Sequence, residues 1–265
     1  MHRNKNIDQQ ERRIYLINEL VKEDPRLGKV EIPQAPEAQK RVLRSLMNIR
    51  PPRPAGKDFL RVQDEYLQEA LAEKGITDSS DLEPSPLDSR LYLWRGDITT
   101  LRIDAIVNAA NSGMTGCYVP CHGCIDNCIH TYSGIQLRLA CGRIMEEQGH
   151  EEPTGKAKIT PAFNLPSDHV IHTVGPIVYG PLTQTHCRLL ADCYRSCLET
   201  ASEKGLKSIA FCCISTGEFH FPQEKAARIA VETVREFLQK ESSIRQVVFN
   251  VFKEEDYEIY KGILG

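Results

Sequence analysis

The chain has 265 residues, of which 41% are apolar and 26% are charged, so it can build a core and is not disordered throughout. Its formal net charge of −3 gives no polybasic surface for nucleic acid or an anionic membrane. No apolar run approaches the length of a membrane span, and the N-terminal stretch MHRNKNIDQQERR lacks the apolar segment of a secretory signal. We therefore expect a soluble, cytoplasmic protein that binds neither nucleic acid nor membrane.

The first third of the chain carries helical patterns. Apolar residues recur at helical spacing over residues 14–21 and 42–47, and prolines end both patterns. A third helix is predicted over residues 58–74, and the stretch 79–89 (SSDLEPSPLDS) has the composition of a linker. We predict that residues 1–88 form a helical extension, a cap or a docking appendage, with no catalytic chemistry of its own.

Residues 89–265 alternate between strand and helix patterns. Strands are predicted at residues 91–94, 103–108, 170–174, 208–214 and 246–252, and helices at residues 126–147, 186–204 and 223–239. This order is typical of an α/β layered domain, in which ligands bind on loops beyond the carboxyl ends of the strands. Four such loops carry side chains with useful chemistry.

The first of these loops is rich in cysteine. All ten cysteines lie at or beyond residue 117, and GCYVPCHGC places Cys117, His122 and Cys124 at C-x4-H-x-C spacing between turn-forming glycine and proline. Two thiolates and one neutral imidazole balance the charge of Zn²⁺, so the spacing predicts a zinc site. Three alternatives stay open. Cys121 or Cys128 could complete a closed structural site, Cys121 with Cys124 could form a redox pair, and the loop cysteines could be free thiols.

The other three loops contain residues that suit a nucleotide. In NAAN (residues 108–111), small alanines let a ligand approach and the asparagine amides can bind sugar hydroxyls. ISTGEF (residues 214–219) precedes a helix and can aim N–H groups at a phosphate, although it lacks the lysine of a Walker loop. Asp97 in GDIT can accept a hydrogen bond from a base or cap the next turn. Each segment alone also fits an ordinary turn.

In combination and in this order, GDIT, NAAN, IDNCIH and ISTGEF-x-FP resemble the macrodomain, the ADP-ribose-binding module. The cysteine-rich loop stands where macrodomain hydrolases usually carry a glycine-rich stretch. In this respect, and in its N-terminal helices, the chain is similar to the zinc-dependent macrodomain ADP-ribosyl hydrolases. The resemblance implies a three-layer α/β/α sandwich around a mixed sheet over residues 89–265, preceded by the helical extension.

The resemblance also implies the roles of individual residues. One zinc per chain would bind Cys117, His122 and Cys124, with the other two loop cysteines as bystanders. ADP-ribose would contact Asp97, Ile98, Asn111, Cys124, Ile125, Asp126, Asn127, Ser215, Thr216, Gly217, Glu218 and Phe219. Asp97 would bind the adenine amino group. The N–H groups at the start of the helix at residues 125–127 and the loop at residues 215–219 would hold the diphosphate, and Phe219 would lie against the distal ribose.

Catalysis would rest on Asn111, which would hold the distal ribose, and on Asp126, which would orient water or act as a base. His130 is expected to be an ordinary hydrogen-bonded histidine within its helix. The implied activity is zinc-dependent removal of mono-ADP-ribose from Asp or Glu residues of a target protein, with release of ADP-ribose.

Several alternatives remain beside this activity. They are a reader that binds ADP-ribose without turnover, an O-acetyl-ADP-ribose deacetylase, and a nucleotide-binding protein with a purely structural zinc. The zinc-dependent subgroup is similar to proteins that work opposite a sirtuin-like ADP-ribosyltransferase on a lipoyl carrier protein. The resemblance therefore makes such a carrier a candidate partner.

Overall fold

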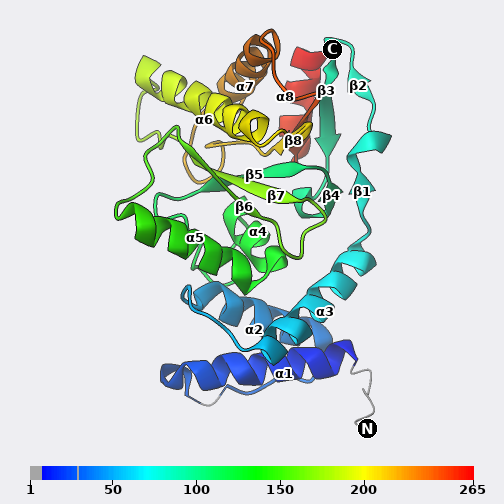
Figure 1. Ribbon diagram of the computed structural model, residues 1–265, viewed down its shortest axis with the longest axis vertical. Helices are drawn as coiled ribbons and strands as arrows, with labels where there is room; N and C mark the ends of the chain where they lie inside the picture. Colours follow the sequence, from blue (N-terminus) through cyan, green and yellow to red (C-terminus); the bar gives the residue numbers. More distant parts are fainter. Residues whose placement is uncertain (1–7, 29) are drawn as a thin grey trace.

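The computed structural model describes residues 8–28 and 30–265; residues 1–7, part of the segment that we inspected for an export signal, lie outside it. A seven-stranded mixed sheet lies between two layers of helices, and three N-terminal helices pack below one layer (Figure 1). This architecture confirms the predicted α/β/α sandwich with N-terminal helices. Within the described ranges, no helix combines the length and apolar character needed to cross a membrane.

Each predicted helix and strand has a counterpart close to its expected place. The helices are α1 (Gln9–Glu23), α2 (Pro36–Ile49), α3 (Lys57–Lys74), α4 (Ile125–Ser133), α5 (Ile135–Gln148), α6 (Gln184–Glu203), α7 (Gln223–Leu238) and α8 (Glu254–Leu264). The strands are β1 (Thr77–Asp78), β2 (Pro84–Ser85), β3 (Asp88–Arg95), β4 (Leu101–Arg102), β5 (Ala105–Ala110), β6 (Ala157–Pro161), β7 (His169–Val174), β8 (Ser208–Phe211) and β9 (Gln246–Val251).

Some predictions of local structure were wrong. The single helix predicted over residues 126–147 is two helices, because Gly134 adopts φ 92° between α4 and α5, a conformation that side chains disfavour. The predicted linker contains β2, which pairs with β3 at the edge of the sheet. Strand β6 was missed because AKITP, at the opposite edge, has no continuous apolar run.

The strand order is β2-β3-β9-β8-β5-β7-β6, and the five inner strands are parallel. Helices on both faces bury β5, β7, β8 and β9, which explains why their sequences are largely apolar. Because parallel strands share a direction, their carboxyl ends meet at one edge of the sheet. The loops after β3, β5, β8 and β9 therefore gather at that edge.

The three N-terminal helices have an apolar cluster of their own. Leu16 of α1, Leu43 of α2 and Phe59 of α3 are buried together, and Ile135 at the start of α5 joins them. In Figure 1 these helices lie directly under α4 and α5. The extension is thus packed against the helices that follow the cysteine-rich loop.

Candidate active site

A cavity of about 750 Å³ opens at the carboxyl edge of the sheet. The structure brings all but one of the predicted site residues to its wall: Asp97, Ile98, Asn111, Cys117, His122, Cys124, Ile125, Asp126, Ser215, Thr216, Gly217, Glu218 and Phe219. Its volume lies within the range of small-molecule sites. The four loops, far apart in sequence, form one site.

Two residues of the helix after the cysteine-rich loop lie away from the cavity wall. The side chain of Asn127 is fully buried and bonds Arg44 and the carbonyl groups of the loop, so the contact with the diphosphate implied for the start of this helix stays a prediction at Asn127. The prediction that His130 is hydrogen-bonded was wrong: the ring is buried and makes no hydrogen bond with the described residues, although its Nε2 lies 3.6 Å from Asp126 Oδ1. Burial, with neighbouring His172, lowers the pKa of His130 well below its ordinary value, so the ring is neutral.

Sequence reasoning missed the loop after β9. Asn250, Phe252, Lys253 and Asp256 line the cavity, and Phe252 is 78% exposed there. An aromatic face open to a cavity can stack on a flat base. The signal was available, because β9 was predicted and its carboxyl end falls at the same edge as the other loops.

Asp97 caps the turn that follows β3 and also faces the cavity. Its Oδ1 accepts hydrogen bonds from the backbone N–H and the hydroxyl of Thr99, at 3.0 and 2.6 Å. Its Oδ2 lies 2.9 Å from Lys74 Nζ, at the end of α3. Burial raises the pKa of Asp97, but these hydrogen bonds outweigh that effect and leave the pKa below its ordinary value. The carboxylate is therefore charged at neutral pH.

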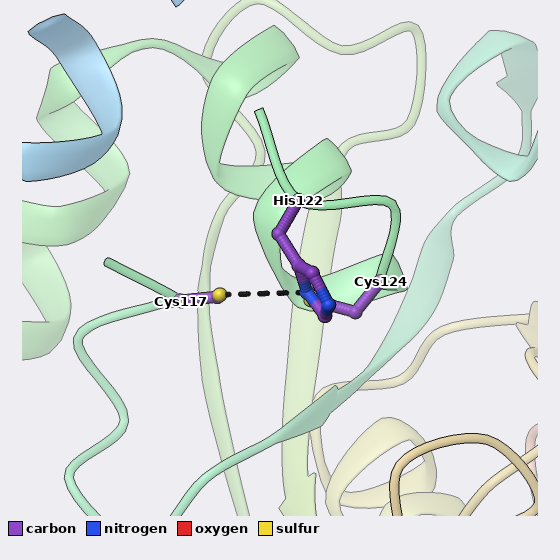
Figure 2. A group of neighbouring side chains, drawn as sticks. All are labelled: Cys117, His122 and Cys124. Carbon is purple, nitrogen blue, oxygen red and sulfur yellow. Dashed lines mark hydrogen bonds between the residues drawn. The ribbon is translucent and has the colours of Figure 1, made fainter. Parts of the chain in front are cut away.

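The cysteine-rich loop brings together three potential metal ligands. The ligand atoms of Cys117, His122 and Cys124 all lie within 4.8 Å of one another. In Figure 2 the sulfur of Cys117 points at the imidazole of His122, with a separation of 3.7 Å between Sγ and Nδ1. Cys121 and Cys128 are outside this group, since their thiols contact Ser45 and Arg44 of α2.

The donor set and its electrostatics fit a zinc ion. Burial, together with the neighbouring Cys117 and Asp126, raises the pKa of Cys124 to about 12. Two adjacent thiols in this buried setting ionise readily only beside a cation, because its positive charge offsets the cost of burying two negative charges. Two sulfurs and one imidazole nitrogen are a common zinc donor set, and three protein ligands leave one position open.

Asp126 lies at the base of the cavity, almost fully buried. Its Oδ1 accepts a hydrogen bond from Asn108 Nδ2 at 2.8 Å, and its Oδ2 accepts one from Asn111 Nδ2 at 3.3 Å. Burial raises the pKa of Asp126 to about 6, and the bond from Asn108 limits the rise. A carboxyl group tuned in this way can take up or release a proton near neutral pH.

The segment after β8 forms a tight loop around the far side of the cavity. Ser215 adopts φ 65°, and its carbonyl accepts a hydrogen bond from Phe221 N–H at 2.9 Å. Phe219 is held by Val178, whose N–H donates to its carbonyl at 2.9 Å. Ser215 Oγ is buried without a partner among the described residues, so it is available to a ligand.

Comparison with known proteins agrees with this geometry. A family model described as the Macro domain matches residues 107–230. A protein-ADP-ribose hydrolase of Treponema medium is 60% identical over 259 residues, which cover 97% of this chain and 99% of that protein.

Two solved structures share the fold. The Oceanobacillus iheyensis macrodomain with ADP is 42% identical, with a TM-score of 0.59 over 65% of this chain and 88% of that one. The Trypanosoma brucei macrodomain in complex with ADP-ribose is 28% identical, with a TM-score of 0.65 over 88% of this chain and 97% of that one. The sandwich, the four loops at one sheet edge and the near-complete match to a curated relative lead to one conclusion: the chain belongs to the macrodomain family.

Proposed function

We propose that this protein is a hydrolase that removes ADP-ribose from modified proteins, that its substrate is mono-ADP-ribose on acidic side chains, and that it depends on zinc. The observation that carries the proposal is a cavity in which a three-ligand metal loop and the buried carboxylate of Asp126 lie beside loops suited to a nucleotide. The 60% identity to a protein-ADP-ribose hydrolase supports the same activity.

The cavity suggests how the nucleotide would bind. The charged carboxylate of Asp97 accepts a hydrogen bond from the adenine amino group, and the exposed ring of Phe252 stacks on the base. Free N–H groups at the start of α4 and in the loop from Ser215 to Phe219 receive the diphosphate. The distal ribose then reaches Asn111, next to the metal loop.

At that end of the cavity, Asp126 holds a water molecule and takes its proton at a carboxylate oxygen as the water attacks the ester carbonyl. The bond from that carbonyl to the ribose oxygen then breaks, and Asp126 returns the proton to the leaving ribose oxygen. Asn108 and Asn111 hold the carboxylate by one oxygen each, so its direction is set before substrate binds. Cys117, His122 and Cys124 would hold the zinc ion, which would supply a Lewis acid at this end of the cavity. The products are ADP-ribose and the free acidic side chain.

Release of ADP-ribose from a protein mono-ADP-ribosylated on acidic residues tests the proposal. Single-turnover rates are compared for wild type, chelator-stripped protein and His122→Ala. Loss of the metal should lower the rate at least about a hundredfold. Binding of free ADP-ribose should survive, because the adenine and diphosphate contacts do not involve the metal.

Two other outcomes would support the alternatives. Equal rates in all three samples would mean that the metal is incidental, and no release by any of them would favour a reader. Parallel assays with O-acetyl-ADP-ribose test the smaller ester. A lipoyl carrier protein modified by a sirtuin-like ADP-ribosyltransferase is the partner that we propose to test first.

A further inference from the structure

The cysteine-rich loop has little backbone support of its own. Over residues 116–124 of the described structure, a single backbone hydrogen bond joins two residues of the loop, from His122 N–H to the Val119 carbonyl at 3.2 Å. A loop with so few internal bonds does not hold its side chains at fixed separations. The spacing of the three metal ligands must therefore be set by contacts from outside the loop.

Arg44 of α2 provides such contacts. Its Nη2 donates to the carbonyl of His122 and to Asn127 Oδ1, both at 2.7 Å, and its Nε donates to the same Oδ1 at 3.2 Å. The buried Asn127 connects Arg44 to the rest of the loop, since its Nδ2 donates to the carbonyls of Val119 at 3.0 Å and Cys117 at 3.4 Å. One guanidinium thus holds the backbone of two metal ligands.

The end of α2 holds the loop at further points. Asn48 Oδ1 accepts a hydrogen bond from Cys121 N–H at 2.9 Å. Arg138 of α5 bonds the carbonyl of Arg50 at 2.7 Å with one nitrogen and that of Cys117 at 3.3 Å with the other. The position of α2 itself is fixed by its burial against α1 and α3. The loop is therefore attached to a rigid part of the helical extension.

We propose that Arg44 is a positioning residue of the metal site, and that the N-terminal extension is thereby part of the active site and not a separate appendage. The proposal rests on the metal site of the proposed function. Arg44 touches no ligand atom; it fixes the backbone from which the Cys117 and His122 side chains project. Removal of such outer contacts typically lowers metal affinity about 10–100-fold.

The test compares Arg44→Ala with Arg41→Ala. Arg41 lies one turn earlier on α2 and is exposed, so its variant removes the same charge without touching the loop through its side chain. Zinc affinity is measured by competition with a chromogenic chelator. We expect affinity to fall about 10–100-fold in Arg44→Ala and to stay unchanged in Arg41→Ala. Arg44→Lys keeps the positive charge but loses the planar guanidinium that bonds two acceptors at once, so its zinc affinity should also fall below that of wild type.

A second measurement separates metal binding from general damage to the fold. For each protein, the rise in melting temperature on adding zinc is taken against its own metal-free sample. A rise as large in Arg44→Ala as in wild type would overturn the proposal, even if the metal-free variant melts lower. Equal losses of zinc affinity in Arg44→Ala and Arg41→Ala would also overturn the proposal. Failure of wild type to bind zinc would instead reject the metal site on which the proposed function depends.

Discussion

His122 Nε2 lies 3.6 Å from Glu218 Oε1, so the cysteine-rich loop and the loop after β8 meet across the cavity. The other ring nitrogen of His122, Nδ1, faces Cys117 Sγ. A carboxylate on the second nitrogen of a metal-binding histidine orients the ring and sets its tautomer. The Glu218 side chain is 70% exposed, however, and water weakens its interaction with the ring.

We therefore expect Glu218→Gln to lower zinc affinity by no more than about tenfold, which is the smallest loss typical of residues that contact a metal ligand rather than the metal. Chelator competition measures the change. Glu224→Gln is the matched control, since Glu224 is an exposed carboxylate on α7 that pairs, among the residues that the structure describes, with Arg228 alone. A loss as large as that in His122→Ala would contradict this role and make Glu218 a ligand.

Cys117→Ala and Cys124→Ala should each remove zinc or deplete it strongly, because each takes away one of the three proposed ligands. Metal analysis of purified protein gives the zinc content per chain. Cys121→Ala is the control from the same loop: its thiol lies 3.2 Å from Ser45 Oγ, outside the ligand group, and the variant should retain the metal. Zinc retained in both ligand variants, with loss from Cys121→Ala combined with Cys128→Ala, would refute the assignment.

Asp97→Ala should weaken ADP-ribose binding about tenfold to a hundredfold. A hydrogen bond to a charged group contributes roughly 1.5–3 kcal/mol, and the substitution removes it from the adenine end of the cavity. Titration calorimetry measures the dissociation constant. Asp168→Ala removes an exposed carboxylate before β7, at the opposite edge of the sheet, and should bind as wild type does. Wild-type affinity in Asp97→Ala would show that Asp97 only caps its turn.

Asn111→Ala should lower the rate of ADP-ribose release more than the affinity. The side chain donates to Asp126 Oδ2 and to the carbonyl of Gly116, and it lines the cavity where we propose that the distal ribose binds. A misplacement of about 1 Å at the reacting centre can cost about a hundredfold in rate. Single-turnover release and calorimetry on the same preparation separate the two effects. A parallel fall in both would indicate that Asn111 only binds.

Gly175→Ala should damage the loop after β8. A Cβ at this position would overlap Ser215 Oγ and lie 2.9 Å from Ile214 Cγ2, so the loop would have to move. Overpacking of this kind costs roughly 1–3 kcal/mol of the free energy of unfolding. Denaturant unfolding measures that loss, and calorimetry should show weaker ADP-ribose binding.

Gly262→Ala is the control for this substitution. A Cβ there meets open space in α8, and alanine favours a helix over glycine by about 0.5–1 kcal/mol. The control should therefore be neutral or slightly stabilising. A Gly175→Ala protein with unchanged unfolding and binding would show that Ser215 can move without consequence.

The local features of the site were predictable from sequence because each is encoded over a few residues. The buried strands read as apolar runs, so the loops at their carboxyl ends could be identified, including Asp97 after β3 and Asn111 after β5. The spacing of Cys117, His122 and Cys124 likewise predicted a ligand group that the structure brings within 4.8 Å. A parallel sheet then places such loops at one edge.

Contacts between distant segments were not predictable in this way. No local pattern indicated that the Asn127 side chain bonds Arg44, which lies 83 residues earlier in the chain. Lys74 of the extension pairs with Asp97, and Phe252 enters the cavity from the last strand. Helical periodicity shows which face of α2 is buried but not which helix covers it. The packing of α2 against α4 brings the extension into contact with the cysteine-rich loop. Only the tertiary structure decided this contact, because it depends on how surfaces far apart in the sequence fit together.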